Sequence, residues 1–318
     1  MNKAILLAVL STIFVAGCVQ GQIPFLQTTT TVMGGTGMVM TDFSPDETEV
    51  YGGQTDRIMM TVSNKGGYSV PDTNSLVYLT GSALDLAGNN AIYWTQSGTE
   101  YQIKKFGKEM KPYDPVRDIP ADEKMITWSL VAPNLVAGQQ ADYLFIGRVY
   151  YDYQTRVSGN VWVYSETEAD AARSAGTTMN KATWSATSGP VAINARVTQD
   201  PVILYEGEDS LTLVVKVSNV GGGVLYKNGF IDYSTGSPDA LAISSDELNR
   251  VNVALNFAGE ELSNACTGDF ELVGGKDLTL TCDLYIAPPA TFKSYPIAIT
   301  ASYGYYTERT ATVSVSGR

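Results

Sequence analysis

Apolar and polar residues alternate with a period of two along several short stretches of the chain. In the first half, Ile58, Met60 and Val62 occupy every second position, and the same spacing recurs over residues 211–217. Alternation over about five to eight residues is typical of a strand that buries one face, and Gly, Pro, Asn and Ser bound each stretch. The pattern predicts antiparallel sheets, with one short helix expected at residues 166–174.

The second half of the chain repeats landmarks of the first at an offset of 152 to 156 residues. Each half contains a strand that ends in a Ser-Asn-x-Gly-Gly turn, at residues 63–67 and 218–222. Each half also contains an apolar strand that begins with a tyrosine, Tyr143 or Tyr295, as in the tyrosine corner of immunoglobulin-like domains. The repeat therefore predicts an all-β chain with two copies of one sandwich.

We predict two tandem immunoglobulin-like antiparallel β-sandwiches of about seven strands each, at residues 41–164 and 191–318, joined by a linker at 165–190. A polar insertion at 96–125 interrupts the first sandwich. The sequence motifs are a Pro, an aromatic-Gly pair, the Ser-Asn-x-Gly-Gly turn and a late Tyr-x-Tyr strand. Together they resemble the cell-adhesion-related (CARDB-type) modules of bacterial and archaeal surface proteins. The resemblance covers both sandwiches and implies a scaffold whose members are mostly non-catalytic.

The N-terminus has the features of an export signal. Residues 1–17 contain Lys3 followed by an apolar run too short to span a bilayer comfortably, and two small residues precede Cys18. This pattern resembles a lipoprotein signal, which implies that Cys18 becomes the acylated N-terminus and that residues 18–40, rich in Thr and Gly, form a flexible tether. The alternatives are an ordinary signal peptide with an incidental cysteine and an uncleaved anchor helix.

The remaining two cysteines, Cys266 and Cys282, form an even pair. The stretch between them alternates around a Gly-Gly turn near residue 274, so it predicts a hairpin in which the two cysteines lie opposite one another. A disulfide there would stabilise the chain by about 3 kcal/mol in an oxidising compartment. Two reduced thiols packed in a core are the alternative.

Composition argues against nucleic-acid binding and against catalysis. The net charge is −12 and no basic stripe is present to neutralise phosphates. The chain has no histidine, so it lacks the usual general base and the commonest nitrogen ligand for a transition metal. Acidic pairs occur at residues 46–47 and 246–247, but no nucleophile elbow or phosphate loop accompanies them. We predict no enzyme activity, no catalytic residue, no cofactor and no metal site.

Two strands rich in aromatic residues are candidate ligand contacts, since tyrosine rings stack against sugars. Their alternative role is core packing between strands, which is common for aromatic residues in sheets. The candidate contacts are Tyr151, Tyr153, Tyr303 and Tyr305, with Tyr150, Tyr306, Trp162 and Trp184 nearby.

The insertion at 96–125 contains two further clusters. Three aspartates spaced by four offer oxygen ligands to calcium, although the loop lacks the calcium-binding consensus and solvated charge is the alternative. A basic and aromatic cluster offers contacts to anionic glycans or lipid headgroups, or is simply a solvated face. The aspartates are Asp114, Asp118 and Asp122, and the second cluster comprises Lys104, Lys105, Lys108, Lys111, Tyr101, Phe106 and Tyr113.

The leading functional hypothesis is a non-catalytic, lipid-anchored surface protein in adhesion, envelope structure or protein interaction. Its expected partners are the membrane, through the N-terminal lipid, and other surface proteins or glycans. The alternatives are a surface lipoprotein that binds a glycan or peptide, and a filament subunit that donates residues 19–40 as a strand to its neighbour.

Overall fold

The structure is a computed structural model of the whole chain. The residues it describes are 36–81, 84–85, 93–97, 101–234 and 237–318. The predicted signal peptide at 1–17 and the acylation site Cys18 lie outside these residues, as does most of the tether. The last part of the predicted tether differs from expectation, because β1 begins at Met38 and both Met38 and Met40 are buried.

The described residues form an all-β architecture with little helix, as the alternation predicts. One sheet has the order β1 (Met38–Pro45), β3 (Thr55–Asn64), β7 (Glu123–Val131) and β5 (Thr95–Gln96). A second sheet has the order β10 (Val191–Val197), β12 (Ser210–Asn219) and β17 (Asp277–Tyr285). In β12 the four apolar residues at alternate positions, 211 to 217, are all buried, which confirms the predicted strand.

A third, larger sheet of eleven strands packs against both smaller sheets. Its main path is β15 (Glu260–Leu262), β14 (Arg250–Phe257), β18 (Phe292–Ser316), β8 (Gln140–Ser165), β4 (Ser75–Gly81) and β6 (Ile103–Lys104). Off this path lie β2 (Glu49–Tyr51), β9 (Thr183–Ala186), β11 (Val202–Leu204), β13 (Val224–Tyr226) and β16 (Gly268–Glu271). The short helical segments are α1 (Glu166–Ala175), η1 (Asp72–Asn74), η2 (Pro238–Leu241) and η3 (Ser245–Glu247).

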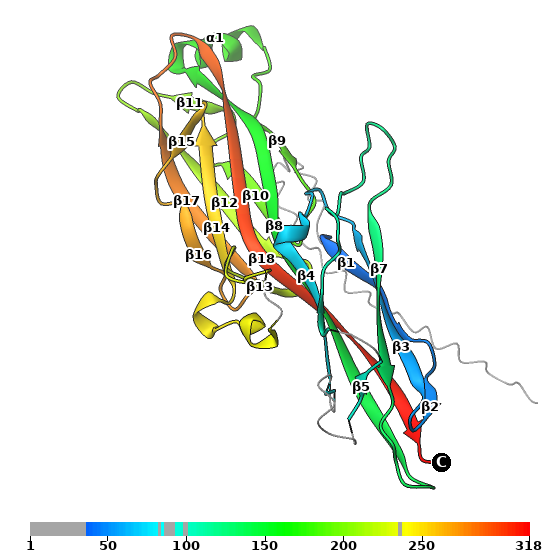
Figure 1. Cartoon of the computed structure of the whole chain (residues 1–318). Helices are drawn as coiled ribbons and strands as arrows, with labels where there is room; N and C mark the ends of the chain where they lie inside the picture. The colour runs from blue at the N-terminus through cyan, green and yellow to red at the C-terminus, as the bar shows by residue number, and fades with distance from the viewer. Residues whose placement is uncertain (1–35, 82–83, 86–92, 98–100, 235–236) are drawn as a thin grey trace, which may run out of the picture.

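The two longest strands, β8 and β18, form one continuous antiparallel ribbon. All 25 residues of β18 pair with β8, from Phe292 opposite Tyr164 to Ser316 opposite Gln140. In Figure 1 the red β18 runs from the end of the molecule near α1 to the opposite end, where the C-terminus lies beside β2. The ribbon therefore connects the two sandwiches along the whole molecule.

The halves of the duplication exchange the ends of these strands. The end of β18 pairs in parallel with β2 of the first half, with Val315 opposite Val50. Equivalently, the end of β8 pairs in parallel with β11 of the second half, with Val163 opposite Val202. Each sandwich thus contains the last part of the other half's final strand, and one buried hydrophobic cluster extends through both. This interleaving departs from the predicted division of the chain on either side of residues 165–190.

The short helix expected at 166–174 is present as α1, and its capping explains its limits. The Ser165 hydroxyl accepts a hydrogen bond from the Glu168 backbone N–H, which satisfies one free donor of the first turn. Gly176 ends the helix with a positive φ of 67°, a conformation that costs glycine little. Because α1 follows β8 directly, it marks the end of the ribbon.

Candidate functional site

Four tyrosines meet at the middle of the ribbon, and we call them the tyrosine quartet: Tyr151, Tyr153, Tyr303 and Tyr305. Tyr151 pairs with Tyr305 and Tyr153 with Tyr303, and the ring centroids of these pairs are 5.8 and 6.1 Å apart. The repeat offset of 152 residues makes Tyr151 equivalent to Tyr303, and Tyr153 to Tyr305. A local two-fold axis of the duplication therefore passes through the pair that the quartet surrounds, Asp152 and Gly304.

Burial corrects the prediction that the tyrosine quartet contacts a ligand. Each of the four side chains is at most 1% exposed. A ring must present an open face to stack against a sugar, and these faces are covered by the strands of both sandwiches. Tyr151 and Tyr153 lie on one face of their strand, as alternation requires, but that face is the core.

The hydroxyl groups of the quartet hold the two Ser-Asn-x-Gly-Gly turns. The Tyr153 hydroxyl oxygen accepts hydrogen bonds from the backbone N–H groups of Gly67 (2.8 Å) and Tyr68 (3.1 Å). In the other half, the Tyr305 hydroxyl accepts from the Gly223 N–H at 2.7 Å and lies 3.0 Å from the Asn219 side-chain oxygen, to which it donates. The repeated turn and the repeated tyrosine are therefore one structural device used twice.

Close packing around these hydroxyls explains a glycine in the turn. A Cβ atom at Gly66 would overlap the Tyr153 hydroxyl. Burial raises the pKa of Tyr153 and of Tyr305 to about 12, so both phenols stay protonated at physiological pH. Burial likewise raises the pKa of Tyr151 and Tyr303 well above the ordinary value. Protonated and inaccessible phenols serve as structural hydrogen-bonding groups and not as general bases.

The opposite face of the ribbon carries a buried acid at the two-fold axis. Asp152 is 8% exposed, and its carboxylate accepts hydrogen bonds from the Tyr233 hydroxyl (2.8 Å) and the Gly229 N–H (3.3 Å). A hydrogen bond of 2.8 Å joins the hydroxyls of Tyr233 and Tyr226. Burial outweighs these hydrogen bonds and raises the Asp152 pKa to about 6.

An insertion in the second half, at residues 227–249, covers this acid. In the sheet, β13 and β14 flank the insertion and both pair with β18, whereas the first half uses the single strand β4 against β8. The insertion carries Ile231, Tyr233 and Leu241 into a small apolar cluster with Tyr150. The sequence interpretation missed this site. Its only signal was an aspartate in an aromatic strand where the other half has a glycine.

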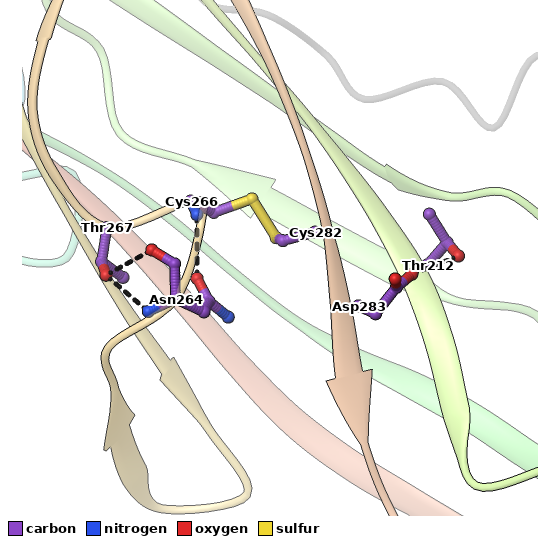
Figure 2. Close-up of a disulfide and its surroundings, with 6 residues drawn as sticks. All are labelled: Thr212, Asn264, Cys266, Thr267, Cys282 and Asp283. Carbon is purple, nitrogen blue, oxygen red and sulfur yellow. Dashed lines mark hydrogen bonds between the residues drawn. A yellow bond between two sulfur atoms is a disulfide. The ribbon is translucent and has the colours of Figure 1, made fainter.

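The predicted disulfide is present, and Figure 2 shows it joining Cys266 to Cys282. Its setting differs from the predicted hairpin. Cys282 lies in β17 and pairs across to Leu213, whereas Cys266 lies two residues before β16, which pairs with β14 in the large sheet. The bond therefore connects the two layers of the second sandwich. An Asn264 side chain that accepts from the Cys266 N–H at 2.9 Å holds the loop in place.

The lysines of the predicted basic and aromatic cluster are engaged within the chain. Lys105 donates to the carbonyls of Asp72 (3.1 Å) and Ser75 (2.8 Å), and burial lowers its pKa. Lys104 donates to a backbone carbonyl at 2.7 Å, and Lys108 forms an ion pair of 2.6 Å. Phe106 is buried, Lys111 lies 3.9 Å from a glutamate, and Tyr101 and Tyr113 are exposed. These side chains form no continuous basic surface.

The three aspartates of the predicted calcium site bind separate partners. Asp114 accepts backbone N–H groups of its own turn, and Asp118 accepts the Tyr113 hydroxyl at 2.8 Å. Asp122 accepts from Lys108, and this hydrogen bond lowers its pKa. Within the part of the chain that the structure describes, no three His, Cys, Asp or Glu side chains gather closely enough to hold a metal.

The remaining candidates are also placed by ordinary packing. Asp46 forms a salt bridge with Arg57, and Glu247 lies 3.6 Å from Lys227, so the two acidic pairs lie apart in different sandwiches. The Trp162 ring packs 6.0 Å from Phe292. The second candidate tryptophan, Trp184 in β9, is half-buried against the core. None of the helices in the described ranges has the length and apolar character needed to cross a bilayer.

Comparisons with known proteins add little to this description. No protein-family model and no curated protein matches the chain. Among solved structures, it is similar to the D0-D1 domain of intimin, with 11% identity, 87% of this chain and 98% of that chain covered, and a TM-score of 0.18. A red sea bream transglutaminase is 11% identical over 87% of this chain and 31% of its own, with a TM-score of 0.19. The Enterococcus faecalis MSCRAMM ACE is 10% identical over 88% and 95%, with a TM-score of 0.16. Such scores carry no argument about function, and the fold class rests on the strand pairing described above.

Proposed function

We propose that the chain is a non-catalytic, lipid-anchored surface protein that presents a rigid double sandwich to protein partners in adhesion or envelope assembly. The observation that carries the proposal is the β8–β18 ribbon. It joins two sandwiches without a linker and gives the exposed outer strands fixed positions over the length of the molecule. An enzyme needs a reachable reactive group, and the polar groups at the centre of this molecule are engaged in holding turns and strands together.

The position of the N-terminal end supports a role as a displayed scaffold. Thr36 lies at the middle of the molecule, where its hydroxyl donates to the Lys65 carbonyl at 2.8 Å and lies 3.0 Å from the Ser188 hydroxyl. A lipid on Cys18 would therefore hold the molecule near its centre, through 17 intervening residues. Both ends of the ribbon would then be open to partners.

Two further features support a location outside the cytoplasm. The disulfide between Cys266 and Cys282 is typical of proteins that fold in oxidising compartments. The resemblance to CARDB-type modules of surface proteins points to the same place, and to a scaffold. A glycan-binding role through the tyrosine quartet has no support, since those rings are buried.

Acylation and fractionation test the anchor. Cells expressing the chain are labelled with an alkyne fatty acid and separated into membrane and soluble fractions. We expect the wild-type chain in the membrane fraction with label, and Cys18→Ser unlabelled. Protease added to intact cells should degrade the wild-type chain. A chain that stays soluble in the cytoplasm with residues 1–17 attached would refute the proposal.

Crosslinking on intact cells tests the scaffold role. A photoreactive amino acid is placed at an exposed position of each end, at Tyr285 in the second sandwich and at Tyr51 in the first. The buried Tyr303 serves as the matched control position, provided that this variant folds. We expect defined adducts with other surface proteins from at least one end and none from the control. Adducts to lipid alone, at both ends, would contradict the role.

A further inference from the structure

The edge of β18 that faces away from β8 has an uncovered segment in its second half, within the part of the chain that the structure describes. Along this edge β14 pairs with residues 297–302, β13 with 304–306 and β2 with 314–316. Residues 307–313 lie between these partners, and no strand within the described ranges pairs with them there. Proteins rarely leave such a segment open, because unpaired backbone groups invite another strand.

The backbone groups at this segment point outwards. At the same edge, the Ser314 N–H donates to the Thr48 carbonyl at 2.9 Å. Backbone groups alternate between the two edges of a strand, so the N–H and C=O groups of Glu308, Thr310 and Thr312 point to the same side as those of Ser314. These residues therefore form a ready template for one more antiparallel strand.

The duplication shows what occupies the equivalent edge in the other half. Subtracting the repeat offset of 152 converts residues 309–312 of β18 into residues 157–160 of β8. Those residues are the ones that pair with β9, from Val157 opposite Ala186 to Asn160 opposite Thr183. The next hydrogen bond of this pairing runs from the Thr187 N–H to the Arg156 carbonyl at 2.8 Å. One half thus carries an edge strand that the described part of the other half lacks.

A groove and an unpaired hydroxyl mark the entrance to the open edge. The groove has a volume of about 470 Å³ and lies between residues 36–40, which lead into β1, and residues 305–309 of β18. The Thr307 hydroxyl lines it and is buried without a hydrogen-bond partner among the described residues. Its equivalent, Thr155, has its hydroxyl 2.8 Å from the Tyr303 hydroxyl. The equivalent of Tyr303 in this half, Tyr151, also lines the groove, but no hydrogen bond joins its hydroxyl to that of Thr307 among the described residues.

The strand register identifies the occupant. Met38 of β1 pairs with Asn64 just as Val191 of β10 pairs with Asn219, so β1 and β10 are equivalent at an offset of 153. Residues 30–33 (Thr-Thr-Val-Met) are then equivalent to β9. We propose that residues 30–33 of the same chain add to β18 as an antiparallel edge strand along residues 309–312.

The side chains at the proposed pairing are complementary in size. In the described pair, Trp184 lies opposite Gly159, and a Cβ atom on Gly159 would come within 2.8 Å of the indole ring. At the proposed pair the glycine is replaced by the larger Ala311, and the tryptophan by the smaller Thr31. Three of the four residues at 30–33 are β-branched, a composition that favours strands.

A docked strand in the same chain needs little connecting sequence. Thr36 already lines the groove beside residue 309, so only Gly34 and Gly35 separate the proposed strand from a described position. Docking would also leave a shorter tether, residues 19–29, between Cys18 and the sandwich. That consequence rests on the proposed anchor, whereas the docking itself does not.

Disulfide trapping in the full mature chain tests the register. The pair Val32→Cys and Thr310→Cys joins residues that would be directly opposite, with both side chains on the exposed face. The matched control is Val32→Cys with Ser302→Cys, eight residues away on the same face of β18, where β14 already pairs. We expect an intramolecular disulfide in the first variant and none in the control, by mass spectrometry of unreduced protein. Equal crosslinking in both variants would overturn the register, and disulfide-linked dimers would overturn docking within one chain.

Hydrogen exchange provides a measurement without new cysteines. The mature chain is compared with a variant that lacks residues 19–33 and keeps Cys18. We expect the amides of Thr310 and Thr312 to exchange about tenfold or more faster in the shortened chain, because they lose strand hydrogen bonds. The amides of β8 that β9 covers are the internal control and should not change. Unchanged exchange at residues 308–312 would overturn the proposal, whether or not the chain is anchored.

Discussion

Replacing Asp152 with asparagine should change how stability depends on pH. Asp152 lies at the two-fold axis of the ribbon, 8% exposed, and accepts hydrogen bonds from Tyr233 and Gly229. Asparagine has the same shape and keeps one acceptor for the Tyr233 hydroxyl. Its amide group cannot accept from the Gly229 N–H, and this loss should cost about 1 kcal/mol at every pH. The substitution therefore isolates the contribution of the charge.

The size and sign of the pH effect follow from the raised pKa. Burial raises the pKa of Asp152 from 3.8 to about 6, a difference that corresponds to about 3 kcal/mol. Because the folded pKa is the higher one, the group's contribution to stability is fully present below pH 3.8 and is lost as the pH rises through about 6. The wild-type chain should therefore lose about 2–3 kcal/mol relative to Asp152→Asn between about pH 4 and pH 7.5.

Guanidinium unfolding followed by tryptophan fluorescence measures this difference at several pH values. Titration of the other carboxylates affects both chains and cancels when the two unfolding free energies are subtracted. Asp239→Asn, at an exposed aspartate of the same insertion, is the control and should give a curve parallel to the wild type. If the difference between wild type and Asp152→Asn stays constant within about 0.5 kcal/mol over this range, burial does not control the carboxyl group and the reasoning fails.

Three variants test the packing of the ribbon and the second sandwich by equilibrium unfolding. Gly304→Ala places a Cβ atom into the ring of Tyr226 and should cost about 1–3 kcal/mol, whereas an unchanged stability would show that the ring moves freely. Tyr153→Phe leaves the Tyr68 N–H without its acceptor, whereas the Gly67 N–H keeps the Ser188 carbonyl, so it should cost about 1–2 kcal/mol, and no loss would show that the Tyr68 N–H finds another partner. Replacing Cys266 and Cys282 with alanine should cost about 3 kcal/mol, and equal stability with and without reductant in the wild type would contradict this.

The strands and turns were predictable because each depends on local chemistry. Alternation located β3 and β12, and the Ser-Asn-x-Gly-Gly motif located the turns that follow them. Alternation also put Tyr151 and Tyr153 on one face, but it cannot say whether that face meets solvent or a second sheet. Tyrosines at every second position of a strand look the same in the sequence whether they face solvent or the core. The tyrosine hydroxyls form hydrogen bonds with turns that lie far away in sequence. Such long-range hydrogen bonds leave no pattern in the local sequence.

The disulfide also shows that local sequence does not determine which strands pair. An even pair of cysteines sixteen residues apart predicted the bond correctly. Placing Cys266 opposite Cys282 in one hairpin assumed that adjacent strands pair with each other. In the structure β16 pairs with β14 and β17 pairs with β12, so the chain crosses from one layer of the sandwich to the other at residues 272–276. A sandwich offers two partners to every strand, and turn chemistry alone does not choose between them.

The lengths of β8 and β18 indicate the exchange of strand ends, whereas the repeat offset does not. A repeat offset of 152 residues is equally compatible with two separate sandwiches and with interleaved ones, since both give the same internal similarity. The lengths of β8 and β18, 26 and 25 residues, are not equally compatible. At about 3.3 Å per residue each strand extends for about 80 Å, whereas sandwich strands usually have about 3–10 residues. Two such strands can be buried only if each passes through both sandwiches. Their antiparallel pairing then makes the repeat's two-fold axis cross the ribbon at its centre, at Asp152 and Gly304.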